Sequence, residues 1–173
     1  ATFAIAATNN PYAKHKTIIV TSDIGESMLH YSAAKNFNAL MSSFITQQSL
    51  SHCGIASAVM VLNALEVEPP LSPTYAPYKF FTQDGIFYDE KLLDIVRPAQ
   101  VQFSGITLNK LAELMRFYAV EVKTFYASST DLNNFRSIAI DALQHKNQAV
   151  IVNFCRRVLG QSGCGHFSPL GGY

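Results

Sequence analysis

The sequence predicts an α+β fold in one domain at residues 1–173, and two observations support this class. The chain has 173 residues, of which 49% are hydrophobic and 14% charged, so it is long and apolar enough for one core. Helical patterns precede the two strongest strand patterns, at residues 148–154 and 166–173. Helices followed by strands favour α+β over an alternating α/β fold. We therefore expect an N-terminal helical part, with the apolar helix at residues 53–65 packed on an antiparallel sheet.

The N-terminal part of the chain predicts one strand and two helices. Residues 17–20 are typical of a short strand, and residues 27–34 of a helix. Residues 53–65 are the strongest helix candidate, because large apolar residues recur at helical spacing with small residues between them. This stripe consists of Ile55, Val59, Leu62 and Leu65. The prolines at residues 69–77 end any helix that starts here.

The middle of the chain predicts a loop and two helices. Residues 80–87 are rich in aromatic side chains around an Asp-Gly sequence, which is typical of a loop. Residues 91–97 predict a short helix that Pro98 ends. Thr107 is a suitable N-cap for a helix at residues 108–118, whose large apolar side chains share one face.

The last third of the chain predicts three strands and one helix. Residues 120–125 alternate between apolar and polar side chains, as a half-buried strand does. Asp131 is a candidate N-cap for a helix that runs to about residue 145. The apolar run at residues 148–154 predicts a buried strand, and a glycine-rich turn leads to another strand at residues 166–173.

The charge balance argues against two classes of partner. With 13 basic and 12 acidic residues, the formal net charge is +1, which creates no field that would attract nucleic acid or an anionic membrane. No apolar run approaches the roughly 20 residues that span a bilayer. We therefore expect no nucleic-acid and no membrane partner. The alanine-rich start at Ala1 fits a cytoplasmic chain or, if a signal peptide has been removed before it, a periplasmic one.

The three cysteines do not suggest a disulfide framework. An odd number at irregular spacing indicates at least one free thiol. We expect Cys155 and Cys164 to be structural. Together with His166 they lack a fourth ligand at zinc-binding spacing, so no metal site is expected.

Two distant segments carry residues suited to chemistry. In the first, Gln47 lies six residues before Cys53, which Gly54 and the apolar helix follow. In the second, the sequence GCGHFSP places His166 at the start of a predicted strand. The spacing Gln-x5-Cys-Gly is that of papain-like cysteine proteases, in which the helix starts at the cysteine.

These residues are suited to thiol acyl transfer. Unpaired N–H groups at a helix N-terminus and an imidazolium at His166 would both stabilise a Cys53 thiolate, the reactive form. Attack on an amide gives a tetrahedral oxyanion that needs fixed donors, and Gln47 and the Cys53 N–H are the candidates. Gly54 would let a substrate backbone approach closely.

Each residue also has an ordinary structural explanation. A single cysteine before an alanine-rich helix is usually a small buried side chain, and a histidine on a strand is more often a hydrogen-bonded core residue. His52 would point away from the neighbouring Cys53 on a helix, so we interpret it as an edge residue. The combination of Gln47, Cys53 and the glycine-rich approach to His166 is what favours catalysis.

Longer motifs add a family resemblance. FITQQ (44–48), CGIASAVMVLNAL (53–65), FFTQD (80–84), GITL (105–108) and VLGQSGCGHFSPLGGY (158–173) resemble phytochelatin synthases, members of the papain-like cysteine peptidase superfamily. A bacterial-type, single-domain member fits best, because the Cys-rich C-terminal domain of plant members has no counterpart in this sequence.

The resemblance implies a papain-like fold and glutathione γ-glutamylcysteinyltransferase activity. Cys53 would attack the Cys–Gly amide of glutathione, His166 would act as general base and acid, and Gln47 would donate to the oxyanion. Glycine would leave, and the γ-Glu-Cys group would pass to a second glutathione, giving a phytochelatin, or to water. Gly165 and Phe167 would line the glycine-side and acyl pockets.

The resemblance also implies the partners. They are glutathione and γ-Glu-Cys peptides, with a homodimer as an open option. No cofactor is required, and cadmium or zinc would enter as thiolate complexes of the substrate in heavy-metal detoxification.

One catalytic member of the family has no counterpart in this sequence. Phytochelatin synthases carry an aspartate on the strand after the histidine, whereas no acidic residue follows His166 up to Tyr173. We therefore expect a domain truncated at its C-terminal end, as a fragment or a cleaved chain, or else a shortened, inactive relative. Such a relative would bind glutathione or metal thiolates without turnover. A general papain-like protease is a third alternative.

Overall fold

A computed structural model describes residues 2–4 and 17–173 of the chain. Within this part the chain forms six α-helices, three short 3-10 helices and two antiparallel strand pairs, so the predicted α+β class is confirmed. The α-helices are α1 (Asp23–His30), α2 (Phe37–Ser42), α3 (Cys53–Ala64), α4 (Pro98–Ser104), α5 (Leu108–Phe117) and α6 (Leu132–Leu143). The strands are β1 (Thr2–Ala4), β2 (Thr17–Ile19), β3 (Ile151–Phe154) and β4 (His166–Pro169). Ala1, on which the expectation about a signal peptide rests, lies outside the described residues.

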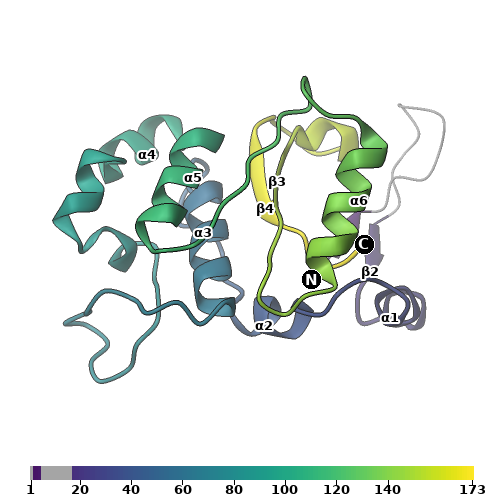
Figure 1. The fold of residues 1–173 in the computed structure, drawn as a ribbon, viewed down its shortest axis with the longest axis horizontal. Coiled ribbons are helices and arrows are strands. Elements are labelled where there is room, and N and C mark those ends of the chain that lie inside the picture. Colours follow the sequence, from purple (N-terminus) through teal and green to yellow (C-terminus); the bar gives the residue numbers. More distant parts are fainter. Residues whose placement is uncertain (1, 5–16) are drawn as a thin grey trace.

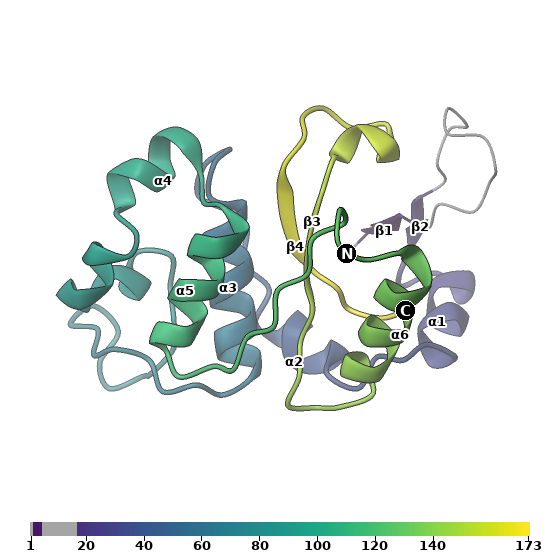
Figure 2. The same ribbon diagram turned by 45° about the horizontal axis from the view of Figure 1, so that its top comes forward.

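The β3–β4 hairpin stands between two groups of helices (Figure 1). Helices α3, α4 and α5 lie on one side of it, and α6, α1 and the β1–β2 pair lie on the other side in both views (Figure 2). The hairpin is antiparallel, and its register runs from Ile151 opposite Pro169 to Phe154 opposite His166. The helix that carries Cys53 packs against β4, as the sequence predicts.

Helix α3 forms the centre of the core. Ten of its twelve residues are buried, and a helix that is apolar on nearly all sides needs neighbours all around it. Leu40 of α2, Leu111 and Leu114 of α5 and Phe167 of β4 are buried in the same cluster. Burial of each such side chain stabilises the fold by about 1.5–3 kcal/mol. The core therefore fixes α3, and with it the position of its first residue.

The predicted starts of three helices are confirmed, and two of these starts have the predicted N-cap hydrogen bonds. Helix α3 begins at Cys53 and ends at Ala64, one residue before the predicted end. The Thr107 hydroxyl and the Asp131 carboxylate each accept a hydrogen bond from the amide three residues later, at 3.3 and 2.9 Å. These bonds satisfy donors that an α-helix leaves unpaired at its start.

The prediction of a strand at residues 120–125 was wrong. These residues belong to no strand pair in the described part of the chain. Val120 and Val122 pack against the core, while the Val122 carbonyl accepts a hydrogen bond from the Arg116 guanidinium at 2.8 Å. Alternate side chains are therefore half-buried as in a strand, but the described part of the chain contains no neighbouring strand that pairs with them.

Two predicted boundaries also need correction, and one helix was missed. Pro98 begins α4 and does not simply end the preceding element, which is a 3-10 helix, Glu90–Asp94. Proline suits the first helical position because its N–H would have no partner there. The helix expected at residues 27–34 is α1, which lies four residues earlier. Helix α2 was not predicted.

The last predicted strand is shorter than expected. β4 ends at Pro169, and the following Leu170 N–H donates to the Val150 carbonyl at 2.8 Å. Tyr173 and Ala33 then exchange two backbone hydrogen bonds, of 3.0 and 3.2 Å. The end of the described chain therefore binds the segment before α2 and does not extend the hairpin.

Candidate active site

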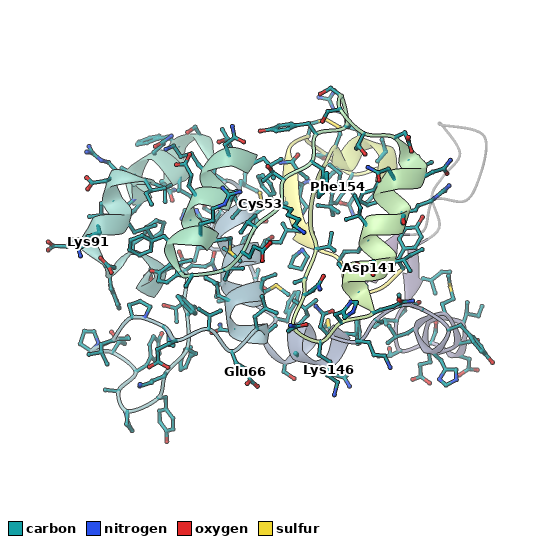
Figure 3. All side chains as sticks on the ribbon, in the orientation of Figure 1. Cys53, Glu66, Lys91, Asp141, Lys146 and Phe154 are labelled. Atoms are coloured by element: carbon teal, nitrogen blue, oxygen red, sulfur yellow. A yellow bond between two sulfur atoms is a disulfide. The ribbon has the colours of Figure 1, made fainter. Side chains whose placement is uncertain are left out.

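Cys53 is a half-buried free thiol at the first position of α3. In Figure 3 it lies at the end of α3 that faces the hairpin. The amides of the first helical turn have no partner inside an α-helix, and the peptide dipoles there favour negative charge. The N-cap residue, His52, makes no side-chain hydrogen bond to these amides. This end of the helix is therefore suited to a thiolate or an oxyanion.

An open pocket of about 540 Å³ lies beside Cys53, and we call it the Cys53 pocket. Its walls are residues 49–51 before α3, residues 102–106 at the end of α4, and Cys164 with Gly165 before β4. Leu50 and Phe103 are 92% and 90% exposed. The volume lies in the range of small-molecule sites, so a ligand of peptide size can reach the thiol.

The start of β4 meets the start of α3 at this pocket. The Cys53 thiol donates to the Gly165 carbonyl, with sulfur and oxygen 3.9 Å apart. Gly165 immediately precedes His166, so the two predicted catalytic segments, distant in sequence, come together. The His166 ring meets the Phe154 ring edge-on, with 5.6 Å between centroids, and Phe154 is labelled in Figure 3.

Two effects lower the pKa of His166 below the ordinary histidine value. The larger is its partial burial, which disfavours the charged ring, and the smaller is the positive charge of Arg156. Arg156 begins the 3-10 helix Arg156–Leu159 between β3 and β4, and its buried Nε has no partner among the described residues. The lowered pKa favours the neutral His166 ring, which can accept a proton.

Gln47 lies in the loop that leads to Cys53. Its Nε2 donates to the Ser49 carbonyl at 2.6 Å. An amide NH₂ carries two protons, and among the described residues only this one acceptor is bonded to Gln47 Nε2. The described residues that line the Cys53 pocket do not include Gln47, and its role as an oxyanion donor stays a prediction.

Two of the predicted substrate-binding residues are packed in the core. Gly54 is buried, and a Cβ built there would lie 2.3 Å from Cγ2 of Ile106 and 3.3 Å from Cδ2 of Phe167. Phe167 is 3% exposed. Close packing therefore explains both residue types, and their contact with a substrate stays a prediction. Gly165, the third predicted residue, does line the Cys53 pocket.

The interpretation of His52 as an edge residue was wrong, because the residue is buried, with only 7% of its surface exposed. Its Nδ1 lies 2.6 Å from Ser49 Oγ, and that oxygen lies 2.9 Å from Ser51 Oγ. Ser51 in turn donates to the Gln102 carbonyl at 2.9 Å. These contacts tie the loop before Cys53 to α4. A serine three residues before a histidine, at a helix start, is the sequence signal for them.

Cys155 and Cys164 form a disulfide, which the cysteine spacing did not predict. It joins the end of β3 to the residue before Gly165, and it closes the loop that holds Arg156. Among the described residues, no three His, Cys, Asp or Glu side chains are grouped so that they could hold a metal ion. No helix in the described ranges has the length and apolar character to cross a membrane.

Comparison with known proteins identifies the family. A family profile described as phytochelatin synthase matches residues 9–173. The chain belongs to the phytochelatin synthase family. Membership confirms the resemblance that the sequence motifs indicated, although it does not test the role of any single residue.

Curated relatives of the chain share this family. Glutathione gamma-glutamylcysteinyltransferase 1 of Lotus japonicus is 35% identical over 140 residues, which are 80% of this chain and 26% of the relative. The protein of the same name from Arabidopsis thaliana is 34% identical over 80% of this chain and 27% of its own length. The Schizosaccharomyces pombe enzyme is 29% identical, over 80% and 32%. The chain thus spans about a quarter to a third of the length of these relatives.

Proposed function

We propose that this chain performs thiol acyl transfer on glutathione, with Cys53 as nucleophile in a papain-like site. The observation that carries the proposal is the contact between Cys53 Sγ and the carbonyl of Gly165, the residue before His166, beside an open pocket. Family membership supports the choice of substrate, because the relatives are named glutathione gamma-glutamylcysteinyltransferases.

In the first step, Cys53 Sγ attacks the carbonyl carbon of the Cys–Gly amide in glutathione. His166 accepts the thiol proton, and its lowered pKa supports this role because it favours the neutral ring. The same ring then donates the proton to the glycine nitrogen as the C–N bond breaks. Glycine leaves, and the γ-Glu-Cys group remains as a thioester on Cys53.

The tetrahedral intermediate of this step carries a negatively charged oxygen. We assign its stabilisation to the Cys53 N–H at the start of α3 and to Gln47 Nε2. The Ser49 carbonyl holds one proton of that amide group, which orients the other. Removal of one such donor lowers kcat by about 10²- to 10³-fold in comparable sites.

In the second step, the amine of another glutathione or a water molecule attacks the thioester. The first acceptor gives a phytochelatin, and the second gives γ-Glu-Cys. The open pocket supports the entry of a second molecule while the acyl group is attached. Cadmium or zinc enters this scheme as a thiolate complex of the substrate.

Glycine release from glutathione tests the proposal. We expect the unmodified chain to release glycine and Cys53→Ser to release none. Circular dichroism should show that the fold of Cys53→Ser is unchanged. The matched substrate is Glu-Cys-Gly with an ordinary α-linkage, which we expect to be a poor substrate. Equal release by both proteins would overturn the proposal, and equal cleavage of both peptides would favour a general papain-like protease. Binding of glutathione without glycine release would favour a non-catalytic relative.

A further inference from the structure

We propose that Cys164 is a thiol–disulfide exchange site at which a glutathione-type thiol becomes attached next to Cys53. The disulfide that Cys164 forms with Cys155 has no part in the acyl transfer described above. Its position is nevertheless close to that chemistry, because Cys164 and Cys53 line the same pocket. A thiol that enters the pocket therefore meets both sulfurs.

The two ends of the disulfide differ in accessibility. Cys164 is exposed and faces the Cys53 pocket, whereas Cys155 is half-buried directly after β3. The Cys155 sulfur lies 3.8 Å from the Gly163 carbonyl oxygen. Exchange needs access of the attacking thiolate to one sulfur and a stable leaving thiolate at the other. Access selects Cys164 as the attacked sulfur.

The leaving side is also suited to its role. Two arginines, Arg156 and Arg157, follow Cys155 in the sequence, and nearby positive charge stabilises a thiolate. The entering sulfur forms a bond to Cys164 Sγ, and the bond between the two protein sulfurs breaks. Its electron pair goes to Cys155 Sγ, which then takes up a proton. The small thiol is the only co-reactant, and the product is a mixed disulfide on Cys164.

A second exchange completes the chemistry. If the Cys155 thiolate attacks Cys164, the small thiol leaves and the internal disulfide forms again. If another small thiol attacks the adduct, a small-molecule disulfide leaves and both protein cysteines are reduced. Cys164 therefore exchanges with the thiol and disulfide forms of the small molecule, and no other oxidant or reductant is needed.

The adduct occupies the space that a substrate needs. A group tethered on Cys164 lies in the pocket that Cys53 lines, and its effective concentration there is on the order of millimolar. We therefore expect the adduct to block acylation of Cys53. The choice of glutathione as the thiol rests on the proposed function, because the proposed substrate carries a thiol into this pocket.

The test uses Cys53→Ser, which removes the acyl-transfer nucleophile and leaves two of the three cysteines. This variant is treated with reduced glutathione, quenched in acid and mapped by peptide mass spectrometry. We expect no free thiol before treatment, and a glutathione disulfide adduct on Cys164 after it. Two free thiols before treatment, or no reaction with glutathione, would overturn the proposal.

Two matched double variants locate the attacked sulfur. Cys53→Ser/Cys155→Ser and Cys53→Ser/Cys164→Ser each keep one cysteine and are treated with glutathione disulfide. We expect an adduct on Cys164 in the first variant and none on Cys155 in the second. Equal labelling of both cysteines, or labelling of Cys155 alone, would overturn the assignment. These experiments need no active Cys53, so their outcome is independent of glycine release.

The block is tested in proteins that retain Cys53. Cys155→Ser is treated with glutathione disulfide, and glycine release is measured before and after a dithiol reductant. We expect glycine release to be lost after treatment with glutathione disulfide and to recover after the reductant is added. The control is Cys155→Ser/Cys164→Ser, in which glutathione disulfide can react only with Cys53. The loss of glycine release must therefore be larger in Cys155→Ser than in this control. Equal losses in the two variants would contradict a block at Cys164.

Discussion

The close packing at Gly54 leads to a prediction that separates a structural role from a substrate contact. In Gly54→Ala, the new Cβ would lie 2.3 Å from Cγ2 of Ile106 and 3.3 Å from Cδ2 of Phe167. The first distance is below 3.0 Å, and Cβ atoms in proteins essentially never have contacts that short. The Ile106 side chain, the segment that carries it or the start of α3 must therefore move.

The expected loss of stability follows from two opposing effects. Overpacking a filled core typically costs about 1–3 kcal/mol. Alanine is a better helix former than glycine by at most about 1 kcal/mol in a helix interior, and Gly54 is near the helix start. We expect a net decrease of about 1–2 kcal/mol in the free energy of unfolding, measured by urea denaturation. A shift of Cys53 by about 1 Å can lower the rate about 100-fold, so glycine release should fall as well.

The matched partner is Ile106→Ala, which removes the Cγ2 atom. Alone it should destabilise the fold, because Ile106 packs against the core. Combined with Gly54→Ala it should relieve the clash, so the two losses should be less than additive by about 0.5–3 kcal/mol. The double variant should also release glycine faster than Gly54→Ala alone.

Two results would refute the packing explanation. One is a Gly54→Ala protein as stable as the unmodified chain. The other is full additivity with Ile106→Ala, together with no recovery of glycine release. A variant that keeps its stability and loses activity would instead support the predicted contact between Gly54 and the substrate.

Three other substitutions test the base, the loop before α3 and the core. Arg156→Gln removes the positive charge that is the smaller cause of the lowered His166 pKa. The acid limb of the kcat/KM profile, where the neutral ring is lost, should therefore move to higher pH, and an unchanged acid limb would contradict the effect of Arg156. Ser49→Ala removes the hydroxyl that is hydrogen-bonded to the His52 ring and should lower kcat about fivefold, equivalent to about 1 kcal/mol, with little change in KM. Ser49→Thr should restore kcat, and an effect on KM alone would argue against a role of this bond in positioning the loop before α3. Asn63→Ala leaves the Phe81 N–H and carbonyl without their partners at 2.7 and 2.9 Å and should lower the free energy of unfolding by about 1–3 kcal/mol in urea; a change under about 0.5 kcal/mol would show that these bonds contribute little.

The elements that the sequence predicted well are those with strong local signals. The start of α3 at Cys53 follows from an uninterrupted apolar helix pattern, and Thr107 and Asp131 are N-caps whose side chains satisfy helix amides in the structure. These signals lie within a few residues of the feature that they predict. They do not depend on where the rest of the chain lies.

The predictions that failed depend on contacts between distant residues. Residues 120–125 have the alternation of a strand, yet only a neighbouring strand could make them one, and no residue of the described chain supplies it. The sequence likewise contains no information on whether Cys155 and Cys164 are close enough to bond. Pro98 shows a third limit, because proline both ends one helix and suits the start of the next.

The candidate site was predicted in part. The sequence predicted Cys53 and His166 as candidates, and the structure brings their segments together through Gly165. It did not identify the contacts of His52, because burial of a polar ring depends on the partner that satisfies it. Nor could it separate the packing of Gly54 from a substrate contact, since both require a residue without a side chain.

The mass of the Cys53 peptide during turnover tests the proposed acyl transfer most directly. The chain is mixed with glutathione, quenched in acid within the first turnover and digested. We predict that Cys53 carries a γ-Glu-Cys group without glycine, and that hydroxylamine removes this group whereas a reductant does not, as expected for a thioester. Glycine release with an unmodified Cys53, or with intact glutathione attached through a reducible disulfide, would contradict the role of Cys53 as the acyl carrier.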